Sequence, residues 1–244
     1  MFDRSKERID DLCRGGLRII QNSSAPCFAI DAVLLADFVI SDKPDRIIDL
    51  GTGTGVIPLL VHVKSPYSRI SGLELMPEMV DMARRSIALN ELDSVLDIIA
   101  GDIRYASEIL PRAEADIVTA NPPYYSLDSG CVSEDLLFAA ARSEVYCRLS
   151  QLLMTAAALL KPLGSFYGVQ RGKRLMDMLY GLRQVGLEPV RLRMVQSFAE
   201  SEANLFLVEA KKNCRAELKI LPPLIIYRQR DIYSEEMQKI YQGR

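Results

Sequence analysis

Hydrophobic and polar positions alternate along this chain in two different periods. From Arg46 onward, short runs rich in Val, Ile and Leu are followed by longer stretches whose apolar residues recur three and four positions apart. The short runs are typical of strands and the longer stretches of helices. The pattern predicts strands at 46–50, 69–75, 95–100, 115–120, 164–170, 188–196 and 203–210. It predicts helices at 54–64, 77–90, 133–160 and 172–185.

Strands that alternate with helices indicate a mostly parallel sheet, here of seven strands, with helices on both faces. The first 45 residues precede this pattern. They contain a short strand at 18–21 and an apolar stretch at 28–38, in which Asp31 is predicted to cap a helix. We therefore divide the chain into a flank or lid at 1–45 and a main domain at 46–244. In parallel sheets, ligands lie at the carboxyl ends of the strands.

Composition narrows the class of protein. The chain has 244 residues, of which 49% are hydrophobic and 25% charged, which is typical of a globular domain. Its apolar runs are well short of the roughly 20 residues of a membrane span, and the polar start MFDRSKERIDD does not resemble a signal peptide. We expect a cytoplasmic protein without a membrane partner. A net charge of −2 means that any nucleic-acid binding must use a local basic patch.

Cysteine and histidine usage limits the possible chemistry. The five cysteines are dispersed without a C-x-x-C pair, so neither a disulfide framework nor a zinc cluster is indicated. The single histidine, His62, lies in an apolar helical stretch, where we expect a structural role. If His62 is structural, no histidine remains for a Ser-His-Asp triad. A chain with a single histidine also cannot form a metal site with several histidine ligands. We therefore expect no metal.

A glycine-rich loop follows the first strand of the main domain. Asp49 opens the sequence DLGTGTG, in which Gly51, Gly53 and Gly55 lack the Cβ atom that would block a ligand from the backbone. The next helix offers free N–H groups at its start. The spacing G-x-G-x-G differs from the dinucleotide fingerprint G-x-G-x-x-G, which disfavours NAD or FAD. A plain strand-to-helix turn would give the same pattern, so the loop alone does not decide.

Acidic residues follow the next two strands. Glu74 ends the second strand at the distance from the glycine loop where a carboxylate accepts hydrogen bonds from a ribose. After the third strand, Asp102 could accept a hydrogen bond from the amine of an adenine, and Ile103 could pack on its ring. Either carboxylate could instead be a solvated strand end. Together with the loop, they favour an adenosine-containing ligand.

The fourth strand leads into Asn-Pro-Pro-Tyr at 121–124. Two consecutive prolines fix the backbone and remove two N–H donors. In this rigid turn, the Asn121 side-chain oxygen and the Pro122 carbonyl can both accept hydrogen bonds from one planar –NH₂ group. Tyr124 offers a face on which an aromatic ring can stack. The motif therefore predicts recognition of an amide or an aminopurine.

These elements, in this order, resemble the class I S-adenosylmethionine-dependent methyltransferases that modify a planar –NH₂ nitrogen. The flanks, including Glu7–Leu12, Leu17–Gln21, Asp31–Ala36 and Pro222–Tyr227, are similar to the bacterial tRNA1(Val) adenine-N6-methyltransferase family. The resemblance covers nearly the whole chain. It implies a Rossmann-like fold, S-adenosyl-L-methionine as cofactor and RNA, most simply tRNA, as substrate. One departure is Ser143 in Ala-Arg-Ser-Glu at 141–144, where such proteins commonly have histidine.

The resemblance implies roles for the residues. The cofactor is expected to contact the glycine loop with Asp49, and also Glu74, Asp102 and Ile103. The residues expected to act in catalysis are Asn121, Pro122 and Tyr124. For the RNA we expect contacts from an aromatic side chain and from basic ones at the rim of the sheet: Tyr125, Arg142, Arg171, Lys173 and Arg174. Two alternatives remain open: methylation of a glutamine amide in a protein such as a release factor, and a non-catalytic cofactor-binding module.

Overall fold

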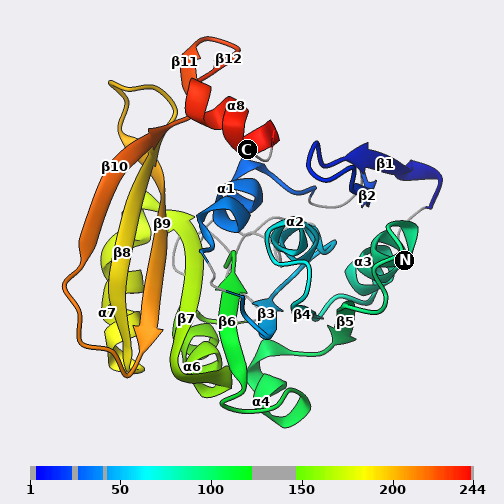
Figure 1. Ribbon diagram of the computed structural model, residues 1–244, viewed down its shortest axis with the longest axis horizontal. Coiled ribbons are helices and arrows are strands. Elements are labelled where there is room, and N and C mark those ends of the chain that lie inside the picture. The colour runs from blue at the N-terminus through cyan, green and yellow to red at the C-terminus, as the bar shows by residue number, and fades with distance from the viewer. Residues whose placement is uncertain (1–3, 24–26, 41–42, 123–146, 243–244) are drawn as a thin grey trace.

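The computed structural model describes residues 4–23, 27–40, 43–122 and 147–242. Its centre is a sheet of eight strands in the order β10-β8-β9-β7-β6-β3-β4-β5 (Figure 1). The strands are β3 (Arg46–Leu50), β4 (Arg69–Glu74), β5 (Leu96–Ala100), β6 (Ala115–Ala120), β7 (Leu160–Arg171), β8 (Leu187–Gln196), β9 (Ala203–Lys212) and β10 (Lys219–Ile225). Only β9 runs antiparallel to its neighbours, so the predicted mostly parallel sheet is confirmed.

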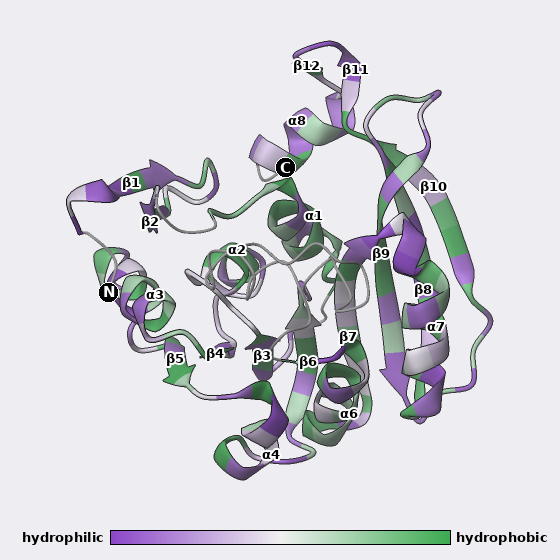
Figure 2. Cartoon of the chain, turned by 180° about the vertical axis from the view of Figure 1, so that it is seen from behind, coloured by the Kyte–Doolittle hydropathy of each residue, from purple (hydrophilic) through white to green (hydrophobic). Residues whose placement is uncertain are grey.

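Helices cover both faces of the sheet. They are α1 (Ile30–Phe38), α2 (Val56–Lys64), α3 (Pro77–Leu89), α4 (Ala106–Ile109), α6 (Leu149–Leu159), α7 (Leu175–Gln184) and α8 (Glu235–Gln242). Successive residues of a strand point to opposite faces of the sheet. In β3, Ile47 packs in one core with α1, α2, α3 and α8, and Ile48 packs in the other core with α4, α6 and α7. Figure 2 shows hydrophobic residues on the strands and on the helices that cover them.

The count of seven strands was one short. The additional strand, β10, contains Pro222 and Pro223 and pairs in parallel with β8 at the end of the sheet, with a register shift between Leu221 and Leu224. Proline cannot donate to a strand ladder and is tolerated at sheet edges and bulges. The two prolines explain why this segment was not predicted to be a strand.

Other predicted elements agree with the structure apart from their ends. The stretch predicted as a helix at 172–185 begins as a 3₁₀ turn, η4 (Gly172–Arg174), before α7. Of the helix predicted at 133–160, the described part contains α6, and residues 133–146 lie outside the described residues. Beyond β10 the chain adds a small hairpin of β11 (Tyr227–Gln229) and β12 (Ile232–Tyr233), followed by α8.

The first residues form a two-stranded hairpin of β1 (Glu7–Asp11) and β2 (Arg18–Asn22), preceded by the short turn η1 (Arg4–Lys6). The hairpin is attached to α3: the Arg85 guanidinium pairs with Glu7 at 2.7 Å, and the Ile20 amide donates to the Ser86 hydroxyl at 2.9 Å. The strand predicted at 18–21 is thus confirmed. Helix α1 continues from the hairpin into the core beside α2.

Candidate functional site

The glycine loop joins β3 to α2 and has the backbone that only glycine adopts without strain. The φ angles of Gly51, Gly53 and Gly55 are +73°, +59° and +86°. The amides of Gly51 and Thr52 donate to the carbonyl of Leu73 at 2.9 and 3.1 Å, which fixes the loop against β4. Apart from its two chain neighbours, no described residue has an atom within 4 Å of the position that a Cβ on Gly53 would take. Among the described residues, the backbone at Gly53 therefore faces open space.

Glu74 lies directly beside this loop. Its carboxylate accepts hydrogen bonds from the amides of Gly53 and Met76, each at 2.9 Å. The side chain is buried, and this burial raises the pKa of Glu74. Each oxygen uses one of its acceptor positions in these bonds, so the carboxylate can still accept from hydroxyl groups.

The residues after β5 reach the same place from the other side. A Cβ on Gly51 would lie 3.7 Å from Cδ1 of Ile103, so this side chain lines the glycine loop. Asp102 begins the 3₁₀ turn η2 (Ile103–Tyr105) and accepts from the Arg104 amide at 2.8 Å. The Arg104 guanidinium also pairs with this carboxylate and thereby lowers the pKa of Asp102. Any ligand that uses Asp102 must share it with Arg104.

Asp49 lies under the loop as a buried carboxylate. Its Oδ1 accepts from the Thr119 hydroxyl at 2.6 Å, whereas Oδ2 is buried and has no hydrogen-bond partner among the described residues. Burial is the main reason that the pKa of Asp49 rises to about 6. A buried carboxylate oxygen without a partner is costly, and a ligand that donates hydrogen bonds there would relieve this cost.

Asn121 follows β6 at the carboxyl edge of the sheet. Its Nδ2 donates to Oδ2 of Asp31 at 3.1 Å. Its Oδ1 is buried and accepts no hydrogen bond within the described part of the chain. Pro122 is buried next to it. Tyr124, Tyr125, Arg142 and Ser143 lie outside the described residues.

The prediction that Asp31 caps α1 was wrong. The N-cap is Ala29, and Asp31 lies one residue inside the helix, 5% exposed. Its Oδ1 accepts from the Ala32 amide at 2.9 Å, and its Oδ2 faces Asn121. Sequence reasoning missed this contact. The only signal was a carboxylate in the otherwise apolar stretch 28–36, which a capping role explained equally well.

Basic residues lie on the same edge of the sheet. Arg171 ends β7, three residues beyond the Gly168 that pairs with Ala120 of β6, and its positive charge acts on Asp31. Lys173 is exposed in η4. Arg174 is mostly buried and pairs with Asp177 at 2.9 Å. The exposed Arg148, which the sequence analysis did not single out, precedes α6 and lines a groove between α6 and α7 together with Arg174.

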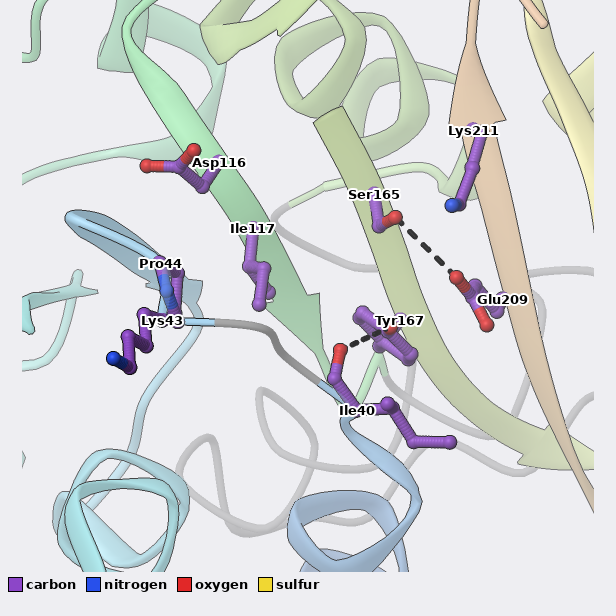
Figure 3. A pocket seen from close by; sticks show the side chains of 9 residues that line it. All are labelled: Ile40, Lys43, Pro44, Asp116, Ile117, Ser165, Tyr167, Glu209 and Lys211. Atoms are coloured by element: carbon purple, nitrogen blue, oxygen red, sulfur yellow. Dashed lines mark hydrogen bonds between the residues drawn. The ribbon is translucent and has the colours of Figure 1, made fainter. Parts of the chain in front are cut away.

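A different pocket lies at the opposite edge, where β6 and β7 begin (Figure 3). Two hydrogen bonds cross it: Ser165 donates to Glu209 at 3.3 Å, and Tyr167 donates to the carbonyl of Ile40 at 2.8 Å. None of the predicted site residues is among those that line this pocket. The predicted residues that the structure describes thus gather at the carboxyl edge.

The model of the methyltransferase small domain family matches residues 30–184, which include the glycine loop, Glu74, Asp102 and Asn121. The chain belongs to this family. It is therefore a methyltransferase, and its cofactor is S-adenosyl-L-methionine, as the sequence predicted. The Rossmann-like α/β fold is confirmed as well.

Several curated relatives of this methyltransferase are named tRNA1(Val) (adenine(37)-N6)-methyltransferase. The protein from Porphyromonas gingivalis is 28% identical over 197 residues, which are 78% of this chain and 76% of the relative. The protein from Histophilus somni is 26% identical and covers 92% of both chains.

Solved structures share the fold of the methyltransferase. A predicted O-methyltransferase from Agrobacterium tumefaciens has a TM-score of 0.71 at 22% identity, covering 88% of this chain and 96% of its own. The geranyl diphosphate C-methyltransferase of Streptomyces coelicolor, solved with S-adenosyl-L-homocysteine, has a TM-score of 0.53 at 13% identity over 75% of this chain and 78% of its own.

Two features are absent from the described residues. No helix among them is long and apolar enough to cross a membrane. Within the same residues, no three His, Cys, Asp or Glu side chains are grouped so that they could hold a metal ion.

Proposed function

We propose that this methyltransferase transfers a methyl group to the exocyclic N6 of an adenine in tRNA. The observation that carries the proposal is the Asn121 amide at the carboxyl edge of the sheet, whose Nδ2 is engaged by Asp31 and whose Oδ1 is buried with no partner among the described residues. An acceptor in this state suits the N–H group of an adenine amine. The names of the curated relatives, which match 78% and 92% of this chain, support RNA as the substrate.

The residues around the glycine loop fit the cofactor. Open space at Gly53 would admit the methionine part against the backbone, and the free Oδ2 of Asp49 could accept from its ammonium group. Glu74 would accept from the ribose hydroxyls, and Ile103 would pack against the adenine. When bound, the cofactor supplies an activated methyl group on a sulfonium sulfur.

Asn121 acts on the amine that receives this methyl group. In adenine the lone pair of N6 is delocalised into the ring, which makes the nitrogen a weak nucleophile. Hydrogen bonds from its two protons to Asn121 Oδ1 and the Pro122 carbonyl favour a pyramidal nitrogen, and they strengthen as positive charge develops there. Once N6 has accepted the methyl group from the sulfonium, the positively charged nitrogen would be acidic and would lose one proton to solvent.

The substrate must reach this pocket as an unstacked base. Tyr124 would replace part of the stacking that the adenine loses on leaving the RNA, with Tyr125 beside it. Exposed cations on the same edge, Arg171, Lys173 and Arg148, would contact phosphates, and Arg142 would help to order the substrate. Arg174 is a weaker candidate for such contacts because its guanidinium already pairs with Asp177. The proposed location of the enzyme is the bacterial cytoplasm, where tRNA is modified.

One labelling experiment tests the substrate. The enzyme is incubated with methyl-labelled S-adenosyl-L-methionine and, in separate reactions, total tRNA, bulk DNA and a release factor. The expected result is label in tRNA alone, recovered as N6-methyladenosine after digestion to nucleosides. Label in the release factor would instead support the glutamine-amide reaction, and bound cofactor without any labelled acceptor would support a non-catalytic module.

A further inference from the structure

The amide of Asn121 can be inserted in two orientations that differ by a half-turn about its last side-chain bond. One orientation presents Oδ1 to the substrate and the other presents Nδ2, which cannot accept a hydrogen bond. An amine bound against Nδ2 would meet donor against donor. The proposed reaction therefore needs something that selects the first orientation.

Asp31 supplies this selection. A carboxylate only accepts hydrogen bonds, so it pairs with the Nδ2 end of Asn121, at 3.1 Å, and repels the Oδ1 end. The pair is shielded from water, since Asp31 is 5% exposed and Oδ1 of Asn121 is buried. Hydrogen bonds to a charged group in such surroundings are among the stronger ones.

Burial raises the pKa of Asp31, and the hydrogen bonds and the positive charge around it hold the carboxyl group in place and partly offset this rise. Its other oxygen accepts from the Ala32 amide at 2.9 Å, in the first turn of the nine-residue helix α1, where the helix dipole stabilises negative charge. Arg171 contributes a positive charge from the end of β7. These contacts aim the remaining oxygen at Asn121.

We propose that Asp31 is a positioning residue for methyl transfer, which holds the Asn121 amide with its oxygen toward the acceptor amine and polarises it. This inference rests on the proposed role of Asn121. The negative charge behind Nδ2 increases the electron density on Oδ1, so the amide binds an amine more strongly as positive charge develops on nitrogen. Asp31 acts only through Asn121 and does not contact the reacting atoms.

The first test removes the acceptor. Asp31→Ala is expected to lower kcat about 10- to 100-fold, in line with the loss of one hydrogen bond to a charged group. The Kd for S-adenosyl-L-methionine and the KM for tRNA should stay within about twofold, because the proposed role of Asp31 is exerted only through Asn121. Asp37→Asn is the matched control: this carboxylate lies on the same helix but pairs with Arg14, and its replacement should leave kcat unchanged.

The second test reverses the pair and works even where Asp31→Ala reduces folding. Asn121→Asp places two carboxylates against each other and should be poorly active. In the double variant Asp31→Asn with Asn121→Asp, the new amide at position 31 can donate a hydrogen bond to the new carboxylate at position 121. The second oxygen of that carboxylate remains available to accept from the substrate. Its kcat should exceed that of Asn121→Asp at least about tenfold, whereas independent residues would give multiplied losses.

The outcomes separate this inference from the proposed function. A kcat of Asp31→Ala within twofold of wild type, beside an inactive Asn121→Ala, would overturn the role of Asp31 alone. A weakened cofactor Kd with normal kcat at saturation would assign Asp31 to cofactor binding and also overturn it. An active Asn121→Ala would contradict the proposed function itself.

Discussion

Thr119 and Asp49 face each other on neighbouring strands, β6 and β3, and share a hydrogen bond of 2.6 Å from the threonine hydroxyl to Oδ1 of the carboxylate. Asp49 lies two residues before the first glycine of the loop, and Thr119 lies two residues before Asn121. The bond thus joins the proposed cofactor-binding loop to the proposed amine acceptor. The same buried contact therefore fixes both elements, and in the proposed reaction it would help to hold the methyl donor and its acceptor in line.

Replacement of Asn121 by alanine should separate transfer from cofactor binding. Because Asn121→Ala removes the buried acceptor Oδ1, we expect kcat to fall about 100- to 1000-fold, the usual loss for one preorganised polar group in a transition state. The Kd for S-adenosyl-L-methionine, measured by calorimetry, should not change. An equal loss of both would show that Asn121 belongs to cofactor binding.

Asp49 should make the free enzyme less stable as pH rises. Its pKa is about 6 in the folded protein against 3.8 as the ordinary value, so between these pH values the unfolded chain loses its proton first. The cost is nearly absent at pH 3, grows from pH 4 to pH 6 and reaches up to about 3 kcal/mol at pH 7. Asp49→Asn should remove it. Urea unfolding of both proteins at these pH values measures the difference in their free energies of unfolding. A difference that does not change with pH would contradict the prediction.

The same carboxyl group should make cofactor binding depend on pH. If Oδ2 of Asp49 accepts from the ammonium group of the cofactor, binding requires the ionised form. The affinity of the wild-type enzyme should then fall about tenfold per pH unit below pH 6, the value to which burial raises the pKa. Asp49→Asn should bind more weakly at pH 7 and lose this slope. Parallel slopes in the two proteins would mean that another group titrates.

A methyl group on Gly53 should weaken cofactor binding beyond its effect on folding. Gly53→Ala and Gly186→Ala both place a Cβ at positive φ, +59° and +76°, where no described residue other than the chain neighbours has an atom within 4 Å. Each should cost about 1–2 kcal/mol of stability through backbone strain. Gly186 lies between α7 and β8 at the opposite edge, so only Gly53→Ala should also raise the Kd for S-adenosyl-L-methionine. Equal Kd values in both variants would place the ligand away from Gly53.

Basic residues on the carboxyl edge should control tRNA affinity. Lys173→Glu and Arg148→Glu should each weaken binding and reduce the slope of log K against log salt by about one, since each proposed phosphate contact releases counterions. Arg112→Glu is the control with the same change in charge, because this exposed residue precedes β6 at the opposite edge. Similar losses in all three would indicate a general effect of net charge.

The sequence was sufficient to predict the elements whose hydrophobic period is undisturbed. Strand β3 and the glycine loop follow directly from a β-branched run and repeated glycines, and the loop has the positive φ angles that require them. Strand β10 was missed because consecutive prolines resemble a loop, and only its position at the sheet edge makes them acceptable.

The location of three candidate site residues could be predicted from the sequence. Glu74, Ile103 and Asn121 each lie at or just after a strand end, and strand ends meet at one edge of a parallel sheet. The pairing of Asp31 with Asn121, 90 positions apart, could not be found, since no local pattern encodes a contact between a helix and a distant strand end. The ion pair between Arg104 and Asp102 was not predicted for a different reason. Opposite charges two positions apart usually remain solvated and form no stable pair.

The consecutive prolines of β10 also bear on how copies of this enzyme can associate. Successive residues of a strand direct their N–H groups to opposite sides, so two prolines in a row leave at least one donor missing on the outer side of this edge. A second copy could not continue the sheet there with an uninterrupted ladder, which protects the enzyme from edge-to-edge aggregation. Any assembly built by extending the sheet would have to use the other end, at β5.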